Sequence, residues 1–315
     1  MNEARIGTVD IPDRADRRHY FAQLSYLELS ALFAGPLKPA ALARWAEVAP
    51  RGTLGLVAPW VFSHRRPPES ARLWRHDPTA GDFRDSAPAR DALRPFRAAI
   101  DAVGAAHAVF RSPPLFAPSA ANRDRLRAFF GEFATAEAIG ASRVWIPDGL
   151  WEPRAAVAFA TELGVLCAID PLVQEPGQPP DLYEDLDAPA LYLRVSGLGR
   201  AGKLRDEQLE DLLALVEHYE DRSVTIAFES PSRWHDALNL KKLLQAASPE
   251  REHLGSASGS AEEPADEDAL DSENGDEDLE DENPIGEDEP AEPDEPADQG
   301  DLEDEDSEGE DDDET

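Results

Sequence analysis

Residues 190–244 read ALYLRVSGLGRAGKLRDEQLEDLLALVEHYEDRSVTIAFESPSRWHDALNLKKLL. Apolar residues alternate with polar ones over residues 191–196 and again over 224–229, which predicts two strands that each have one apolar face. Between them, residues 206–216 place leucines three or four positions apart behind an acidic first turn, a pattern typical of a helix. A second helical pattern covers Ala237–Leu244. The stretch therefore predicts the order strand, helix, strand, helix.

The same alternation runs through the chain upstream of this stretch. Eight strands are predicted, at Arg5–Val9, Tyr26–Ser30, Leu54–Pro59, His107–Arg111, Arg143–Pro147, Val165–Asp170, Leu191–Ser196 and Val224–Glu229. Upstream helices are predicted at Pro39–Val48, Ala89–Val103, Ala120–Ala138 and Pro153–Leu163. The connections over residues 10–23 and 172–186 have weaker helical patterns. Eight strand and helix units predict a closed (β/α)8 TIM-type barrel, with an open doubly wound sheet as the alternative.

Charge divides the 315-residue chain into two predicted parts. Residues 255–315 contain 31 acidic residues and no lysine, arginine or aromatic residue. Such a segment has too little apolar surface to offset the entropy of ordering it. We therefore predict a barrel domain at 1–250 and an acidic disordered tail at 251–315. The rest of the chain is near neutral, with 35 acidic and 30 basic residues.

Cysteine content and hydropathy exclude several classes of protein. Cys167 is the only cysteine, so no internal disulfide and no multi-cysteine metal site is expected. No signal sequence and no apolar run of about 20 residues is present. We expect a cytoplasmic protein that does not contact a membrane. No cofactor is predicted.

In a TIM barrel, functional side chains lie at the carboxyl ends of the strands. Alternation along the predicted strands places one set of residues toward the barrel interior: Tyr26, Glu28, Ser30, Val57, Arg111, Tyr192, Arg194, Ser196 and Glu229. Charged residues on the opposite face would be buried against helices at a cost of several kcal/mol if unpaired. Asp148 and Asp170 follow the ends of their strands and are expected to reach the mouth.

Two carboxylates and two arginines among these residues form the main candidate site. Glu28 and Glu229 would act as general acid and base, while Arg111 and Arg194 hold an anionic group. Tyr192 and Asp170 complete the predicted ligand-binding set. The alternative is a buried ion-pair network, in which Arg194 and Glu229 on adjacent strands pair with each other.

Three further features have weaker functional interpretations. His64, in a loop, is a candidate general base or anion contact. His64, Asp170 and Glu229 lack the spacing typical of a metal site, so no metal is predicted. Residues 197–202 match the pattern GxGxxG after a strand, but a flexible turn is favoured over a phosphate-binding loop.

Residues 65–88 are predicted to form a long, arginine-rich loop that contains Trp74, typical of a lid or a disordered segment. Nucleic acid is not predicted as a partner, because four acidic residues dilute the charge of this loop. The acidic tail is expected to aid solubility. Alternatively it contacts this loop through Arg65, Arg66, Arg72, Arg75 and Arg84, or binds a basic protein partner.

Five segments in the same order and spacing resemble the YecE-like family, also called domain of unknown function 72. The segments are YLELSALFAGPLKPAALARWAEVAP, VFSH, VFRSPPLF, LYLRVSG and VTIAFESPSRWHDALNLKKLL. The resemblance covers roughly residues 5–245 and implies a TIM barrel without an agreed activity. Residues that match the family pattern are Glu28, Phe33, Trp45, His64, Pro113, Pro114, Trp151, Tyr192, Arg194, Gly197 and Phe228.

Most polar pocket positions of that family are changed in this chain. The changed positions are Ser30, Ala34, Val57, Trp145, Pro147, Ser196, Glu229 and Ser230. We therefore expect a ligand-binding or non-catalytic barrel whose pocket is degenerate. The alternative is a hydrolase or isomerase that acts on a small anionic or sugar-like substrate. The non-catalytic interpretation predicts that Trp60, Trp145 or Trp151 fills the mouth, whereas the enzyme needs an open pocket.

Overall fold

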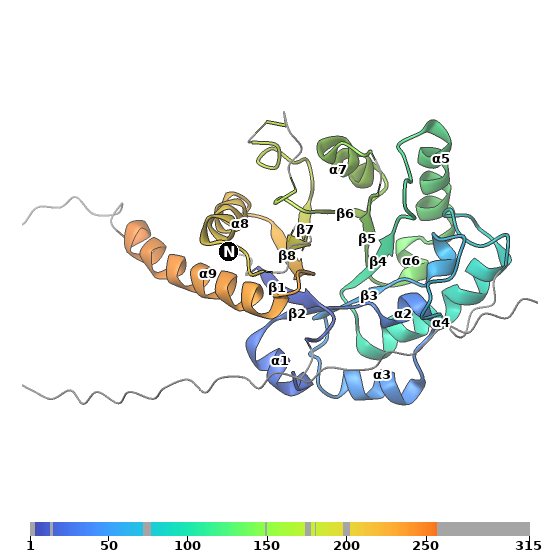
Figure 1. The fold of residues 1–315 in the computed structure, drawn as a ribbon, viewed down its shortest axis with the longest axis horizontal. Helices are drawn as coiled ribbons and strands as arrows, with labels where there is room; N and C mark the ends of the chain where they lie inside the picture. Colours follow the sequence, from blue (N-terminus) through green and yellow to red (C-terminus); the bar gives the residue numbers. More distant parts are fainter. Residues whose placement is uncertain are drawn as a thin grey trace, which may run out of the picture. The chain divides into compact units, whose positions relative to one another are not determined.

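The computed structural model describes residues 4–12, 15–71, 77–148, 150–173, 178–179, 181–197 and 202–256. Eight parallel strands close into a barrel in chain order (Figure 1). They are β1 (Arg5–Val9), β2 (Tyr26–Leu29), β3 (Leu54–Val57), β4 (His107–Arg111), β5 (Ser142–Ile146), β6 (Leu166–Ile169), β7 (Ala190–Val195) and β8 (Ser223–Phe228). β1 pairs with both β2 and β8, which closes the sheet and confirms the predicted (β/α)8 barrel.

Helical segments connect most of the strands and surround the barrel (Figure 1). They are α1 (Arg17–Gln23), α2 (Ala31–Ala34), α3 (Pro39–Ala46), η1 (Trp60–Phe62), α4 (Ala87–Val103), α5 (Ala120–Ala128), η2 (Phe129–Phe133), α6 (Ala136–Ile139), α7 (Pro153–Glu162), α8 (Asp206–His218) and α9 (Arg233–Ser256). Among the described residues between β6 and β7 there is no helix. The Pro-rich sequence of this connection accounts for that, because proline lacks the N–H that a helix interior requires.

The predicted helix over Ala120–Ala138 is wrong as a single element. It consists of α5, a wider π-helical turn (η2) and the short helix α6. Arg143 on β5 is the physical reason for the break. Its buried guanidinium donates hydrogen bonds to the carbonyl oxygens of Phe130 (2.7 Å) and Ala134 (3.0 Å). These carbonyls therefore bind a side chain instead of continuing the α-helical ladder.

Each strand contributes one side chain to a packed cluster inside the barrel. The cluster consists of Val9, Tyr26, Val57, Val109, Val144, Ala168, Tyr192 and Ala227. A larger core lies between the barrel and the helices, and it contains T-shaped contacts between Phe62, Phe96 and Phe110. The barrel is therefore filled by side chains at its centre, and a ligand is accommodated only at its ends.

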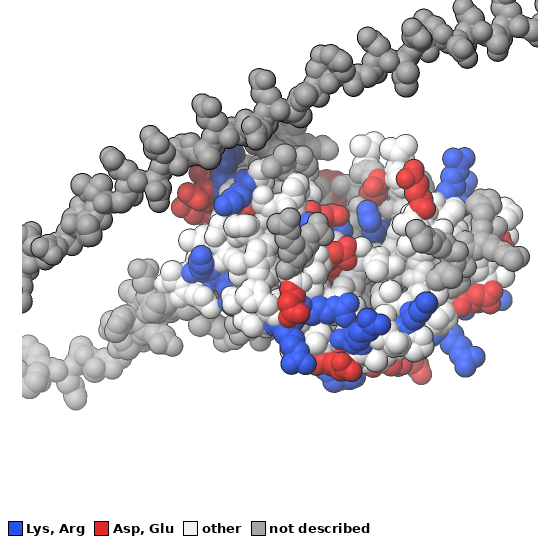
Figure 2. Space-filling model, turned by 60° about the horizontal axis from the view of Figure 1, so that its bottom comes forward, with Lys and Arg blue, Asp and Glu red and all other residues white. Residues whose placement is uncertain are grey.

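Figure 2 shows acidic and basic side chains interspersed over one face of the described residues, with basic ones concentrated along one edge. None of the described helices is long and apolar enough to cross a membrane. Several features of the sequence lie outside the described residues: the tail over 257–315, Arg72, Trp74 and Arg75 of the predicted lid, and residues 198–201 of the glycine-rich segment.

Candidate functional site

A pocket of ≈ 660 Å³ opens at the carboxyl ends of the later strands, and we call it the mouth pocket. Its polar wall contains Asp148, Glu152, Asp170, Gln178, Tyr183, Arg194, Ser196 and Glu229. Its apolar wall contains Ile146, Leu150, Trp151, Ala168 and Val173 among others. The position agrees with the rule that functional residues of a TIM barrel lie where the strands end.

Arg194 lies at the base of this pocket and connects the two predicted acid–base residues. Its Nε donates to Oε1 of Glu28 at 3.2 Å, and its Nη1 forms an ion pair with Glu229. The Glu28 side chain is fully buried, whereas 37% of the Glu229 side chain is exposed. A single guanidinium therefore neutralises one carboxylate below the pocket and another at its surface.

A chain of hydrogen bonds continues from Glu28 into the barrel, and we call it the interior relay. The hydroxyl of Tyr192 donates to Oε2 of Glu28 at 2.5 Å. Tyr26 and Tyr192 join their hydroxyls at 3.0 Å, and Nδ1 of His107 lies 3.1 Å from the Tyr26 hydroxyl. The Glu28 carboxylate can only accept a hydrogen bond, and each tyrosine hydroxyl has one proton to donate. The carboxylate therefore fixes the direction of every hydrogen bond in the chain. His107 therefore donates to Tyr26, and Tyr26 donates to Tyr192.

Burial is the main cause of the pKa shifts of the two tyrosines and the histidine in the interior relay. Desolvation, with the nearby Glu28 carboxylate, raises the pKa of Tyr192 and Tyr26 well above the usual value for a phenol. Burial and the charge of Arg5 lower the pKa of His107 to about 4. Burial alone would lower the pKa of Arg194, but Glu28 and Glu229 raise it above its usual value. At neutral pH both tyrosines and the histidine are therefore uncharged.

Asp170, a predicted ligand-binding residue, holds the neighbouring loops in place. Its carboxylate accepts hydrogen bonds from the backbone N–H (2.8 Å) and the hydroxyl (2.7 Å) of Ser196, and from the N–H of Leu172 at 3.1 Å. Burial and the charge of Asp170 raise the pKa of neighbouring Tyr183 to about 12. Asp170 thus links the ends of β6 and β7 along one side of the mouth pocket.

The tryptophans do not close the mouth pocket. Trp60 and Trp145 are fully buried in the core outside the barrel, where Nε1 of Trp145 donates to the Ser112 hydroxyl at 2.8 Å. Trp151 lines one wall, stacks on Phe159 and donates through Nε1 to the carbonyl oxygen of Phe116 at 2.6 Å. The mouth pocket therefore remains open, and the expectation of the non-catalytic interpretation that a tryptophan fills it is wrong.

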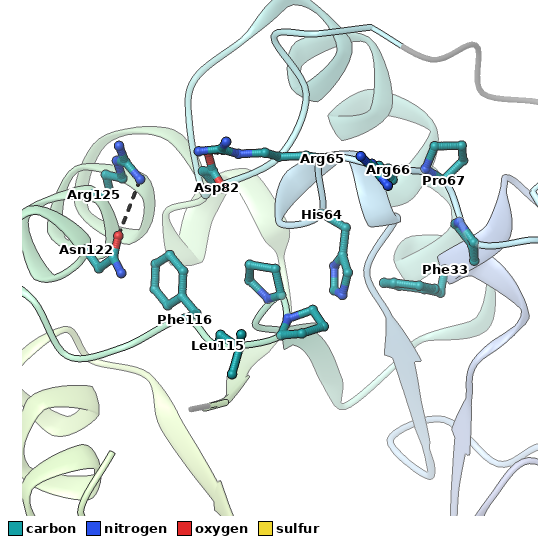
Figure 3. Close-up of a pocket in the computed structure, with 13 residues that line it drawn as sticks. Phe33, His64, Arg65, Arg66, Pro67, Asp82, Leu115, Phe116, Asn122 and Arg125 are labelled. Atoms are coloured by element: carbon teal, nitrogen blue, oxygen red, sulfur yellow. Dashed lines mark hydrogen bonds and ion pairs between the residues drawn. The ribbon is translucent and has the colours of Figure 1, made fainter. Parts of the chain in front are cut away.

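His64 lines a second pocket of ≈ 630 Å³, which we call the arginine pocket (Figure 3). Its imidazole packs edge-on against Phe33 at a centroid distance of 4.9 Å, and Nδ1 lies 2.8 Å from the Ser63 hydroxyl. The guanidinium of Arg111 lies 5.4 Å from the centroid of the same phenylalanine ring. Burial and the charge of Arg111 lower the pKa of His64 to about 4, so this histidine is neutral at pH 7.

The seven predicted site residues thus fall into two groups. In the first group, Asp170, Arg194 and Glu229 line the mouth pocket, while Glu28 and Tyr192 are fully buried and connect to it through Arg194. His64 and Arg111 form the second group, next to Phe33. The predicted pairing of Arg194 with Glu229 is present. Sequence reasoning missed the part of His107 in the interior relay, although strand alternation places it on the same face as Arg111.

Metal ligation has no geometric support among residues that the structure describes. No group of three or more His, Cys, Asp or Glu side chains there is arranged to hold a metal ion. Asp170 and Glu229 both line the mouth pocket, but Asp170 accepts three hydrogen bonds and Glu229 is paired with Arg194.

The sequence matches no protein-family profile and no curated protein. Among solved structures, a DUF72 family protein from Enterococcus faecalis V583 is similar at a TM-score of 0.56 and 15% identity, over 78% of this chain and 98% of that one. A DUF72 family protein from Thermotoga maritima MSB8 is similar at a TM-score of 0.51 and 13% identity, over 77% and 99%.

A D-allulose 3-epimerase from Methylomonas sp., solved in complex with D-allulose, is similar at a TM-score of 0.51 and 14% identity, over 80% of this chain and 98% of that one. At these identities the likeness establishes the fold. The chain thus shares the barrel fold of DUF72 proteins, as the resemblance of its motifs implied.

Proposed function

We propose that the mouth pocket binds a small, uncharged, sugar-like molecule and that the chain acts as a ligand-binding barrel. The observation that carries this proposal is the position of Arg194 between Glu28 and Glu229. The two carboxylates that would serve in catalysis and the guanidinium that would bind an anion are already paired with one another. What the pocket offers a ligand is hydrogen-bonding capacity and not net positive charge.

The charges that line the pocket favour a neutral ligand over an anion. Arg194 is the only basic side chain in the described lining, where four carboxylates occur, those of Asp148, Glu152, Asp170 and Glu229. A phosphate or carboxylate group would meet a surplus of like charge in a partly desolvated site. The anionic class of substrate is therefore disfavoured at this pocket.

Hydroxyl groups fit the same surface well. The Glu229 carboxylate, the Ser196 hydroxyl and the outer edge of Arg194 present acceptors and donors at the base of the pocket. Ile146, Leu150 and the edge of the buried Trp151 supply an apolar wall, against which the C–H groups of a sugar ring can pack. A pocket with an apolar wall and a few convergent polar groups is typical of small-molecule sites.

A thermal-shift screen followed by calorimetric titration tests the proposal. Ketohexoses are the first probes, because the Methylomonas epimerase with this barrel fold holds D-allulose. We expect neutral sugars to stabilise the protein more than their phosphate esters do. Glu229→Gln should weaken binding about tenfold, since it removes a charged hydrogen-bond acceptor. Glu210→Gln, on the exposed face of α8, is the matched control.

Two results would contradict the proposal. The first is a phosphate ester that stabilises the protein more than its parent sugar, because the mouth pocket would then attract anions. The second is equal binding by the wild type, Glu229→Gln and Glu210→Gln, because the ligand would then lie elsewhere.

A second candidate function is isomerisation of such a sugar-like molecule with Glu28 and Glu229 as acid and base. The specific observation in its favour is that a continuous hydrogen-bonded chain from Tyr192 through Glu28 and Arg194 ends at the partly exposed Glu229. An isomerase exchanges a carbon-bound hydrogen of its substrate with solvent. NMR in D2O should then show deuterium entering the sugar with the wild type and not with Glu229→Gln. Absence of exchange across the ketohexoses that bind would exclude this candidate.

A further inference from the structure

The arginine pocket has the opposite electrostatic character to the mouth pocket. Its basic lining residues are Arg65, Arg66 and Arg125, whereas Asp82 is the only acidic residue in the described lining. Asp82 is already shared, because it pairs with Arg65 at 2.7 Å and with Arg84 at 3.6 Å. The pocket therefore has a surplus of positive charge.

Two of these arginines have no carboxylate partner among the described residues. Arg125 donates to the amide oxygen of Asn122 at 3.3 Å, and no ion pair involves Arg66. In Figure 3, Arg66 and Arg125 lie on opposite sides of the pocket, with His64 between them and Leu115 and Phe116 below. Unpaired guanidinium groups at the rim of a pocket are suited to hold an oxyanion.

Apart from His64 and Asn122, the rest of the lining is apolar. It consists of Phe33, Pro67, Pro68, Pro113, Pro114, Leu115 and Phe116. Leu115 is 86% exposed and adopts a left-handed backbone conformation (φ 61°), which is costly for a large side chain. The carboxylate of Asp148 holds it there by accepting the Leu115 N–H at 2.9 Å. An exposed leucine fixed at the rim extends the apolar wall toward a ligand.

We propose that the arginine pocket is a second binding site, separate from the mouth pocket, for a small aromatic anion such as an aryl phosphate. Arg66 and Arg125 bind the anionic group, and the proline and phenylalanine side chains pack against the ring. His64 lies beside the anion and gains a proton when the site fills, because a nearby negative charge stabilises the imidazolium form.

Phenyl phosphate is the probe, with inorganic phosphate and phenol as its two halves. Calorimetric titration at low salt should show binding of phenyl phosphate at least about tenfold tighter than that of either half. The double variant with Arg66→Gln and Arg125→Gln should lose this binding. Arg94→Gln, at an exposed position of α4, is the matched control and should bind as the wild type does.

NMR of the His64 ring provides a readout that general surface attraction would not give. Its pKa should rise from about 4 when phenyl phosphate is added. Glu229→Gln should leave this response unchanged, which separates the arginine pocket from the mouth pocket. Equal binding of inorganic phosphate or phenol would overturn the assignment of an aromatic anion. Unchanged binding by the double variant, or a His64 pKa that does not move, would overturn the site.

Discussion

Replacing Arg194 by methionine removes the cation that two carboxylates share. The important partner is Glu28, which is fully buried and would keep only the hydrogen bond from Tyr192. Breaking a buried ion pair by removing one partner costs about 3–5 kcal/mol. The Glu229 side chain is 37% exposed, so water compensates most of its loss. We therefore expect the free energy of unfolding of Arg194→Met to fall by about 4 kcal/mol at neutral pH.

Urea unfolding at pH 7.5 followed by tryptophan fluorescence measures this change, and a second substitution identifies its cause. The Arg194→Met variant has an uncompensated buried charge on Glu28. Adding Glu28→Gln to Arg194→Met should recover much of the lost stability at pH 7.5, because neither charge remains.

Arg127→Met is the control, since this arginine forms ion pairs with Asp124 and Glu162 at the surface. Its unfolding midpoint should stay close to that of the wild type. The reasoning would be refuted if Arg194→Met lost no more stability than this control. Failure of Glu28→Gln to recover stability in the Arg194→Met background would also refute it, because the loss would then not come from a buried charge.

Three further predictions concern the barrel. Gly55→Ala should lower the free energy of unfolding by about 1–3 kcal/mol, because an added Cβ would lie 2.0 Å from the Tyr26 hydroxyl. Urea unfolding measures this loss. If adding Tyr26→Phe left the loss unchanged, a clash with the hydroxyl would not be its cause. Arg143→Met should lower the free energy of unfolding by about 3 kcal/mol in the same assay, because the carbonyl oxygens of Phe130, Ala134 and Gly164 lose a buried donor. Unchanged stability would show that water replaces this donor. His107 should titrate by NMR near pH 4, and the protein should lose stability as the pH falls from 6.5 to 4, because the unfolded chain binds a proton that the buried histidine resists. His107→Asn should reduce this pH dependence, and a titration midpoint near 6.5 would contradict the burial argument.

The barrel was predictable from sequence because its signal is local and repeated. The bounds of β1 and β4 match the prediction in full, and the other strands differ by one or two residues at either end. The break between α5, η2 and α6 was not predictable, because it depends on hydrogen bonds from Arg143 on the following strand, β5. Helical periodicity does not indicate where a side chain from outside the helix will bind its backbone carbonyls.

The candidate site was predictable only where strand neighbours determine it. Arg194 and Glu229 lie on adjacent strands, so alternation and strand order together predicted their pairing. Glu28 lies two strands from Glu229, and alternation did not predict that the Arg194 guanidinium pairs with both of these carboxylates. The separation of His64 from the mouth pocket depends on loop conformation, which alternation along strands does not describe.

The loop after β4 lines the arginine pocket and is hydrogen-bonded to two residues that line the mouth pocket. The Phe116 ring lines the arginine pocket, while its carbonyl oxygen accepts the Nε1–H of Trp151 from the mouth pocket. The Leu115 N–H is likewise tied to Asp148, which lines the mouth pocket. A ligand that displaces this loop from the arginine pocket will therefore also disturb Asp148 and Trp151 in the mouth pocket. Thermodynamic reciprocity then requires each occupant to change the other's affinity by the same factor.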